Sequence, residues 1–412
     1  MIKRFLKNDL IKGSFILLIL FNLFNLLNFI FHFISARLLG PADYGILATL
    51  MAMIYIINIP SEAIQTVISR FTTTAYVKKD FGALKLLVTK SLGKFLILGV
   101  IGLFIFFIFS GLLSDFFKIE KGLILMLGLV FALTLLTPIP KGLFQGMKKF
   151  GYLGSTFFLE GLLKVGLTTF LILIGWKVYG AMAAITMALL LTFLLNLILP
   201  PTTKVFKAKK SKLQIKGIYS YSIPVLIAIT SITVFYTIDM LLAKRFFGAE
   251  VAGLYGAIAM VSKIVFFVSV PISRALFPLA SENTDKKKSN GSLTKVSLFL
   301  VGLLSLFVLL IYIAFPELVI KILYGSQYLE FSKYLIYPTI AMVILSLTNI
   351  LIFANLSKKN NKPIFMLPIF VILQIILISL FHQTIMQFIW MLIIGNAITF
   401  IYFLISLFRH ED

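Results

Sequence analysis

Long runs of hydrophobic residues recur along the whole chain and decide what it can fold into. A helix that crosses the hydrocarbon core of a membrane needs roughly 20 apolar residues, and this sequence offers many runs of that length. Hydrophobic residues make up 60% of the chain and charged residues only 13%, which is far more apolar surface than a soluble core requires. The sequence therefore predicts an all-α, polytopic membrane protein.

Twelve spans can be placed, and the basic residues between them set the orientation. Most of the 38 Lys and Arg residues fall in alternate loops, and loops rich in Lys and Arg stay in the cytoplasm. We therefore expect a multi-pass protein of the cytoplasmic membrane with both termini in the cytoplasm. The net charge of +23 then reflects the orientation of the chain in the membrane and does not indicate a nucleic-acid partner. The expected spans are 13–35, 45–68, 94–113, 122–144, 152–174, 178–199, 218–242, 251–279, 295–315, 334–355, 363–381 and 386–408.

A ten-residue motif near the N-terminus returns in the second half of the chain. RLLGPADYGI at 37–46 aligns with RFFGAEVAGL at 245–254, and a match at about half the chain length indicates an internal repeat. Two six-helix lobes are expected, at 1–205 and 206–412, joined by a basic cytoplasmic linker at about 200–217. Six spans per repeat place the pseudo-twofold axis along the membrane normal.

The glycines of the motif predict its local geometry. Gly40 and Gly248 are expected to end helices in the left-handed conformation that glycine adopts cheaply, and Pro41 to stop any continuation. Gly45 and Gly253 are expected to let the following helices start close to a neighbour.

Polar side chains recur at helical spacing inside several spans. Such groups are costly in hydrocarbon and usually face protein or water, so we expect either helix–helix hydrogen bonds or a hydrated cavity between the lobes, which the combined pattern favours. The stripe comprises Asn22, Asn25, Asn28, His32, Tyr55, Asn58, Glu62 and Thr66. Four groups are candidates for ion pairs or for coupling to Na⁺ or H⁺, namely Glu62 of this stripe and also Asp239, Glu160 and Lys164.

Metal and thiol chemistry find no support in the sequence. The chain has no cysteine, and its three histidines, His32, His382 and His410, are too scattered for a ligand cluster. No cofactor, metal or catalytic residue is expected. Because the outer loops are short, we expect a transporter and not an enzyme.

Three stretches carry a resemblance to a known family. ARLLGPADYGILA at 36–48, GLFQGMKKFGYLG at 142–154 and TIDMLLAKRFFGAEVAGLYGAIAMVSKI at 237–264 resemble polysaccharide biosynthesis proteins of the Wzx type, in the multidrug/oligosaccharidyl-lipid/polysaccharide (MOP) exporter superfamily. The resemblance implies a MATE-like fold of two six-helix lobes and alternating access. It also implies that the substrate is an oligosaccharide linked to a polyprenyl pyrophosphate, which is flipped across the membrane. The implied partners are membrane lipids and a polymerase or glycosyltransferases.

The resemblance further implies a cavity lined by cations. The residues at suitable positions are Arg37, Arg70, Lys263 and Arg274. Lys263 lies too deep in its span for its side chain to reach either surface, so it must be neutral, be paired with Asp239 or Glu62, or lie in water.

Two other functions remain open at this stage. A cation-coupled multidrug exporter of the same superfamily would need an acidic cavity, for which Glu62, Glu160 and Asp239 are candidates. A membrane-embedded transferase would need a catalytic constellation, and His32 with Asp43 is the nearest approach to one.

Overall fold

The computed structural model describes residues 9–209, 223–285, 291–358 and 361–408, and within these ranges every regular element is a helix. The described residues form two compact units. Unit 1 lies within Met1–Leu39 and Met53–Ile218, and unit 2 within Gly40–Ala52 and Tyr219–Asp412. The short segment of unit 2 that lies early in the chain, 40–52, is the second half of a long helix.

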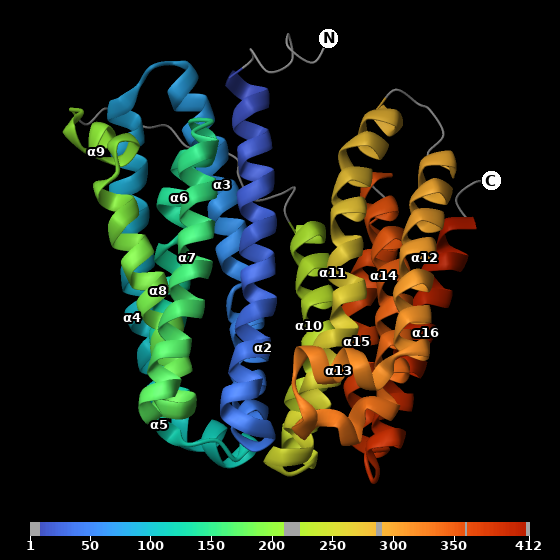
Figure 1. The fold of residues 1–412 in the computed structure, drawn as a ribbon. Coiled ribbons are helices and arrows are strands. Elements are labelled where there is room, and N and C mark those ends of the chain that lie inside the picture. The colour runs from blue at the N-terminus through green and yellow to red at the C-terminus, as the bar shows by residue number, and fades with distance from the viewer. Residues whose placement is uncertain (1–8, 210–222, 286–290, 359–360, 409–412) are drawn as a thin grey trace. The chain divides into compact units, whose positions relative to one another are not determined.

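Unit 1 contains the blue-to-green helices of Figure 1. They are α2 (Asp9–Ile57, apart from the 40–52 segment), α3 (Ile59–Val77), α4 (Phe81–Phe117), α5 (Lys121–Leu136), α6 (Pro138–Gly146), α7 (Phe150–Leu171), the π-helix η1 (Ile172–Trp176), α8 (Lys177–Ile198) and α9 (Pro200–Lys207).

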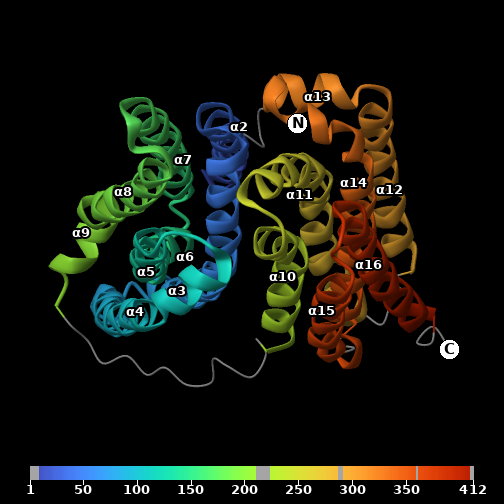
Figure 2. The same cartoon turned by 90° about the horizontal axis from the view of Figure 1, so that it is seen from below.

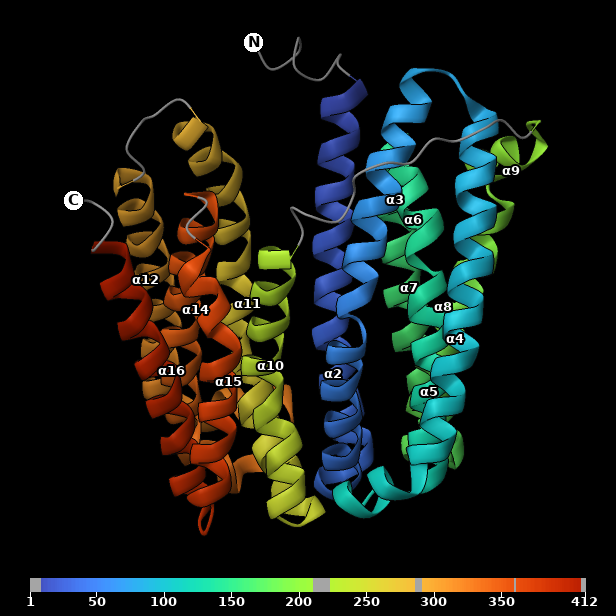
Figure 3. The ribbon, with the colours of Figure 1, turned by 180° about the vertical axis from the view of Figure 1, so that it is seen from behind.

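Unit 2 contains the yellow-to-red helices, seen from behind in Figure 3. They are α10 (Ile223–Phe246), α11 (Ala249–Asp285), α12 (Gly291–Ala314), α13 (Pro316–Leu323), the 3-10 helix η2 (Ser326–Tyr334), α14 (Ile336–Ser357), α15 (Lys362–Leu380) and α16 (Ile385–Phe408).

Ten helical segments of the described residues are long and apolar enough to cross a membrane. Two of them are much longer than one crossing needs. Phe15–Val77 has 63 residues and is broken at Gly40, and Phe150–Ile198 has 49 residues and is broken at Gly175. Each therefore holds two spans of ordinary length, and the described residues contain the twelve spans that the sequence predicts.

Two boundaries differ from the sequence-based expectation. The basic stretch 70–94 was expected to be a loop, but α3 continues to Val77 and α4 begins at Phe81 after a tight turn. Asp80 begins α4 by accepting a hydrogen bond from the backbone N–H of Ala83 at 2.8 Å. Charged residues can remain helical here because the helix ends extend beyond the apolar part of the span.

The motif at 37–46 has the expected break. Gly40 has φ 76° and ψ 171°, which interrupts α2, and the helix resumes at Pro41. The prediction for Gly248 is wrong, because its φ is not positive. The Phe247 N–H still bonds to Ala243 O, and Gly248 O accepts the Ala252 N–H that starts α11. This tight junction needs no left-handed residue.

The predicted close approach at the repeated glycines is confirmed. A Cβ added to Gly45 would lie 2.3 Å from the carbonyl oxygen of Ala249, and one added to Gly253 would lie 1.7 Å from that of Pro41. Only glycine permits these two backbones of unit 2 to pack so closely. The 40–52 segment is thereby held directly against α11.

Three buried tyrosines secure the same segment to the rest of unit 2. The hydroxyls of Tyr44 and Tyr324 are 3.2 Å apart, and both rings pack edge-on against Tyr328 of η2. The helix half that follows Gly40 is therefore tied to α11 by backbone contact and to η2 by aromatic contact.

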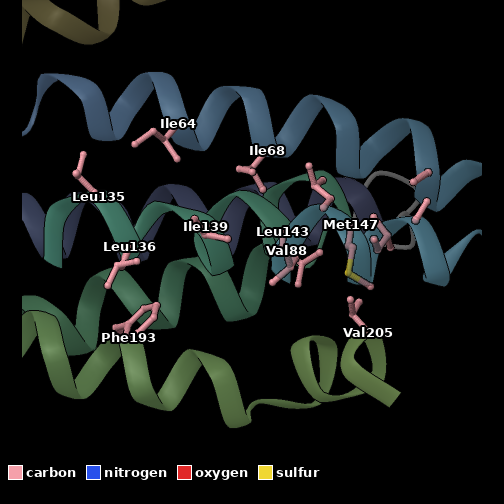
Figure 4. Close-up of a cluster of buried hydrophobic side chains, with 14 residues drawn as sticks. Ile64, Ile68, Val88, Leu135, Leu136, Ile139, Leu143, Met147, Phe193 and Val205 are labelled. Atoms are coloured by element: carbon pink, nitrogen blue, oxygen red, sulfur yellow. The ribbon is translucent and has the colours of Figure 1, made fainter. Parts of the chain in front are cut away.

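Each unit has a core organised around buried helices. In unit 1 a hydrophobic cluster joins α3, α4, α5, α6, α8 and α9 (Figure 4). In unit 2, α14 packs against α11, α12 and α16 (Figure 2). Hydrogen bonds tie α14 to α11, with Ser262 Oγ 3.0 Å from Thr339 Oγ1 and Asn349 Nδ2 donating to Ser273 Oγ at 3.0 Å.

Candidate functional site

An acid, a lysine and a tyrosine meet inside unit 2, between the adjacent helices α10 and α11. Lys263 Nζ lies 3.0 Å from each carboxylate oxygen of Asp239. The hydroxyl of Tyr255 donates to Asp239 Oδ2 at 3.1 Å. All three side chains are buried. Of the two partners that the sequence suggested for Lys263, the structure places Asp239 there.

The position of Lys263 explains why it is paired. It follows the start of α11 at Ala249 by 14 residues, or roughly 21 Å along a helix. A lysine stem is too short to carry its ammonium group to the surface from that depth. Burying an unpaired charge would be costly, so the carboxylate and the tyrosine hydroxyl compensate for lost water.

A second charged pair lies inside unit 1, between α6 and α7. Lys141 Nζ lies 2.6 Å from Glu160 Oε2, and the side chains are only 8% and 14% exposed. The same ammonium lies 4.6 Å from the centre of the Phe157 ring, at which range a cation is attracted by the ring face. Phe157 in turn packs against Phe21 and Phe24 of α2.

Lys164, one turn after Glu160 on α7, is the second buried lysine of this region. Its ammonium donates to Asn28 Oδ1 and lies 4.6 Å from the centre of the Phe31 ring. Glu160 precedes it by four residues on the same helix, a spacing at which opposite charges attract, but the direct ion pair of Glu160 is with Lys141. Two lysines therefore share one carboxylate, and the groups in direct contact with Lys164 are neutral.

The predicted polar stripe divides into a buried and an exposed part. His32 is buried, and its Nε2 lies 3.4 Å from the hydroxyl of Tyr55, which joins the stripes of the first two spans. Asn28 is partly buried against Lys164. The exposed members are Asn22, Asn25, Asn58, Glu62 and Thr66. Asn22 and Thr66 bond to carbonyls of their own helices.

The predicted cavity cations are distributed over both units. Lys263 is buried with Asp239, whereas Arg37 and Arg70 are exposed on unit 1. The backbone of Arg274 belongs to α11, and its side chain lies outside the described residues.

Two residues of the buried clusters, Lys141 and Tyr255, were not predicted from the sequence as site residues. Lys141 falls near the end of the expected span 122–144, where Pro138 and Pro140 suggested that the helix stops, so we counted it among the basic residues of the cytoplasmic side and not as a buried group. These prolines instead occupy the first turn of α6, where proline is tolerated, and Lys141 stays inside the helix. Tyr255 could have been found, since it precedes Lys263 by eight residues and shares its helix face.

The described residues contain no group of three or more His, Cys, Asp or Glu side chains placed to hold a metal ion. The buried clusters described above present lysine ammonium groups, carboxylates, an amide and aromatic rings. Such groups can hold an anion or a sugar.

The fold is similar to solved transporters. An inward-facing multidrug resistance MATE family transporter of the MOP superfamily aligns with a TM-score of 0.76, at 14% identity, over 94% of each chain. The lipid II flippase MurJ in an inward closed conformation aligns with a TM-score of 0.67, at 16% identity, over 94% of this chain and 87% of that one. A MOP superfamily transporter from Pyrococcus furiosus gives a TM-score of 0.62 at 14% identity, over 99% and 98%.

The sequence is also similar to a curated relative. An uncharacterised membrane protein of Methanocaldococcus jannaschii is 25% identical over 279 residues, which are 62% of this chain. The matching region spans 64% of the length of that relative. Residues 10–284 match the family described as polysaccharide biosynthesis protein. With this match over residues 10–284, the chain belongs to the polysaccharide biosynthesis protein family.

Proposed function

We propose that this protein flips a polyprenyl pyrophosphate-linked oligosaccharide across the cytoplasmic membrane by alternating access, for the synthesis of a cell-surface polysaccharide. The family match supports a role in polysaccharide synthesis, and the fold is that of a superfamily that includes a lipid II flippase. Glycosyltransferases would supply the substrate and a polymerase would consume it.

The observation that carries the proposal is the balance of buried charge. Among the described residues, three buried lysines lie well inside spans and have defined contacts, namely Lys141, Lys164 and Lys263. The carboxylates in direct ion pairs with two of them are Asp239, which is buried, and Glu160, which is 14% exposed. An excess of cations within spans suits a substrate that carries negative charge through the membrane, because lysine compensates phosphate by charge-assisted hydrogen bonds.

Lys164 is the buried lysine that we expect to contact the pyrophosphate in unit 1. Its direct partners, Asn28 and Phe31, are neutral, so a phosphate oxygen can replace the amide without separating an ion pair. Lys263 is expected to contribute in unit 2, where a phosphate would have to compete with Asp239.

The test is transport by the purified protein in vesicles that contain a fluorescent lipid-linked oligosaccharide. Its arrival at the opposite leaflet is followed with an impermeant quencher. We expect Lys164→Gln to slow flipping at least about tenfold, which corresponds to the loss of one charge-assisted hydrogen bond. Lys164→Arg should retain much of the rate, and Lys118→Gln, at the end of α4, should match the wild type.

A charge-restoring double variant separates a binding role from a structural one. In Lys164→Gln/Glu160→Gln the surplus positive charge returns, because Lys141 no longer has a carboxylate partner. We expect this variant to flip faster than Lys164→Gln alone. A wild-type protein that inserts and folds but does not flip the oligosaccharide would contradict the proposed function.

The similarity to a MATE multidrug transporter favours a second candidate, a cation-coupled exporter. In the described structure, however, Asp239 and Glu160 are each engaged with a lysine, which leaves them poorly suited to binding cationic drugs. Either function could be driven by Na⁺ or H⁺, with Asp239 or Glu62 as the coupling group. Transport of a cationic dye without transport of the oligosaccharide would decide for the exporter.

A further inference from the structure

The side chains of α4 mark where the membrane begins on unit 1. This helix has 37 residues and is therefore about 55 Å long, whereas the hydrocarbon core is about 30 Å thick. Its exposed large hydrophobic side chains begin at Leu96 and end at Phe116, a stretch of roughly 30 Å. The residues before Leu96 therefore extend beyond the hydrocarbon.

Lysines occupy the surface of α4 immediately outside this apolar belt. Lys94 and Lys90 are exposed and precede Leu96 by roughly 3 Å and 9 Å along the helix. The stretch 81–95 contains no acidic residue. These two ammonium groups consequently lie at the depth of the lipid headgroups.

The short helix α9 presents further lysines at the same end of unit 1, beside the start of α4 (Figures 1 and 3). Val205 anchors it in the hydrophobic cluster, and Lys85 Nζ donates to the carbonyl oxygen of Ala208 at 2.9 Å. These contacts direct the basic side of the segment outward. Its exposed lysines are Lys204, Lys207 and Lys209.

The opposite ends of the unit 1 helices have a different charge pattern. There Lys118, Lys121 and Lys177 are accompanied by Asp115 and Glu120, and Glu120 accepts a hydrogen bond from Tyr179 at 2.9 Å. The concentration of positive charge is therefore a property of one end of the unit.

We propose that the surface formed by Lys90, Lys94, Lys204, Lys207 and Lys209 binds the headgroups of anionic phospholipids in the leaflet that it faces. Charge complementarity and depth both favour a headgroup phosphate over a soluble acidic partner, because Lys90 and Lys94 adjoin the lipid-facing belt directly. Each basic residue near a membrane surface strengthens such binding about fivefold, and salt weakens it. The surface is separate from the buried lysines, so the inference does not depend on the substrate.

The test uses the full-length protein in nanodiscs of phosphatidylcholine alone or mixed equally with phosphatidylglycerol. We expect phosphatidylglycerol to raise the thermal unfolding midpoint at low salt and to remain bound in native mass spectrometry. The variant Lys90→Gln/Lys94→Gln/Lys204→Gln/Lys207→Gln should lose the shift and bind phosphatidylglycerol at least tenfold more weakly. The corresponding four Lys→Arg changes should preserve both.

The matched control is Lys118→Gln/Lys121→Gln/Lys177→Gln, which neutralises lysines at the other end of the same unit. It should respond to phosphatidylglycerol like the wild type. The proposal is overturned if the four-lysine Gln variant keeps the full shift, if the control loses as much, or if phosphatidylglycerol has no effect while soluble polyglutamate binds. Because no transport is measured, failure here leaves the proposed function untouched.

Discussion

Lys164 and Lys263 are buried to the same extent but have different electrostatic partners. Lys263 faces a carboxylate, so that pair carries no net charge. Lys164 faces an amide and an aromatic ring, so the groups that it contacts directly carry no charge. Removing one member of a buried ion pair leaves the other uncompensated, whereas removing a lysine that faces neutral groups does not. The two sites should therefore respond differently to substitution.

At the Lys263 site we expect the single change Lys263→Ala to destabilise the protein by about 3–5 kcal/mol, because Asp239 is left buried without its counter-charge. The double change Asp239→Asn/Lys263→Gln should recover most of that loss. Both are measured as thermal unfolding midpoints of the purified protein and as accumulation in the membrane.

Transport by the double variant separates two roles of Lys263. If Lys263 binds the substrate, restoring the stability of the protein does not restore that contact. We therefore expect the double variant to fold and still to flip the oligosaccharide poorly. Flipping at the wild-type rate would show that Lys263 serves only the fold.

At the scale of elements, the joint between the 40–52 segment and α11 depends on the absence of a side chain. We expect Gly253→Ala to lower stability by about 1–3 kcal/mol, because its methyl group would meet the Pro41 carbonyl oxygen at 1.7 Å and the backbones would have to separate. Gly302→Ala on α12 is the matched control, since nothing lies within 4 Å of the added Cβ. Equal unfolding midpoints for the two variants would refute this account of the joint.

The sequence predicts helices better than it predicts their partners. Span positions follow from the length of apolar runs, and the Gly40 break follows from the chemistry of glycine. Lys141 was missed because two prolines can either end a helix or begin one, and only the packing of α6 against α7 decides. Glu160 shows the same limit, since its spacing to Lys164 suggested a local pair while tertiary structure supplied Lys141.

At the scale of the whole molecule, the remaining expectation is the orientation in the membrane. The net charge of +23 is carried largely by lysines at helix ends, and unit 1 has its excess at the end formed by α9 and the start of α4. If positive charge is retained in the cytoplasm, this end is cytoplasmic and the turn between α4 and α5 lies outside. Because both ends of the same unit carry exposed residues, the orientation can be measured directly.

The chain has no cysteine, so single introduced cysteines can report the topology without first removing native ones. We expect Lys79→Cys and Lys209→Cys, both exposed at the basic end of unit 1, to be protected from an impermeant thiol reagent in intact cells and to react after permeabilisation. Lys118→Cys on unit 1 and Gln327→Cys on unit 2 are also exposed and should react without permeabilisation, because they lie at predicted outer positions. Each position is a surface site, so a lack of labelling reflects the membrane barrier and not burial. Reversed labelling at two or more positions would contradict the cytoplasmic placement of the basic end. The surface formed by the lysines of α4 and α9 would then face the outer leaflet.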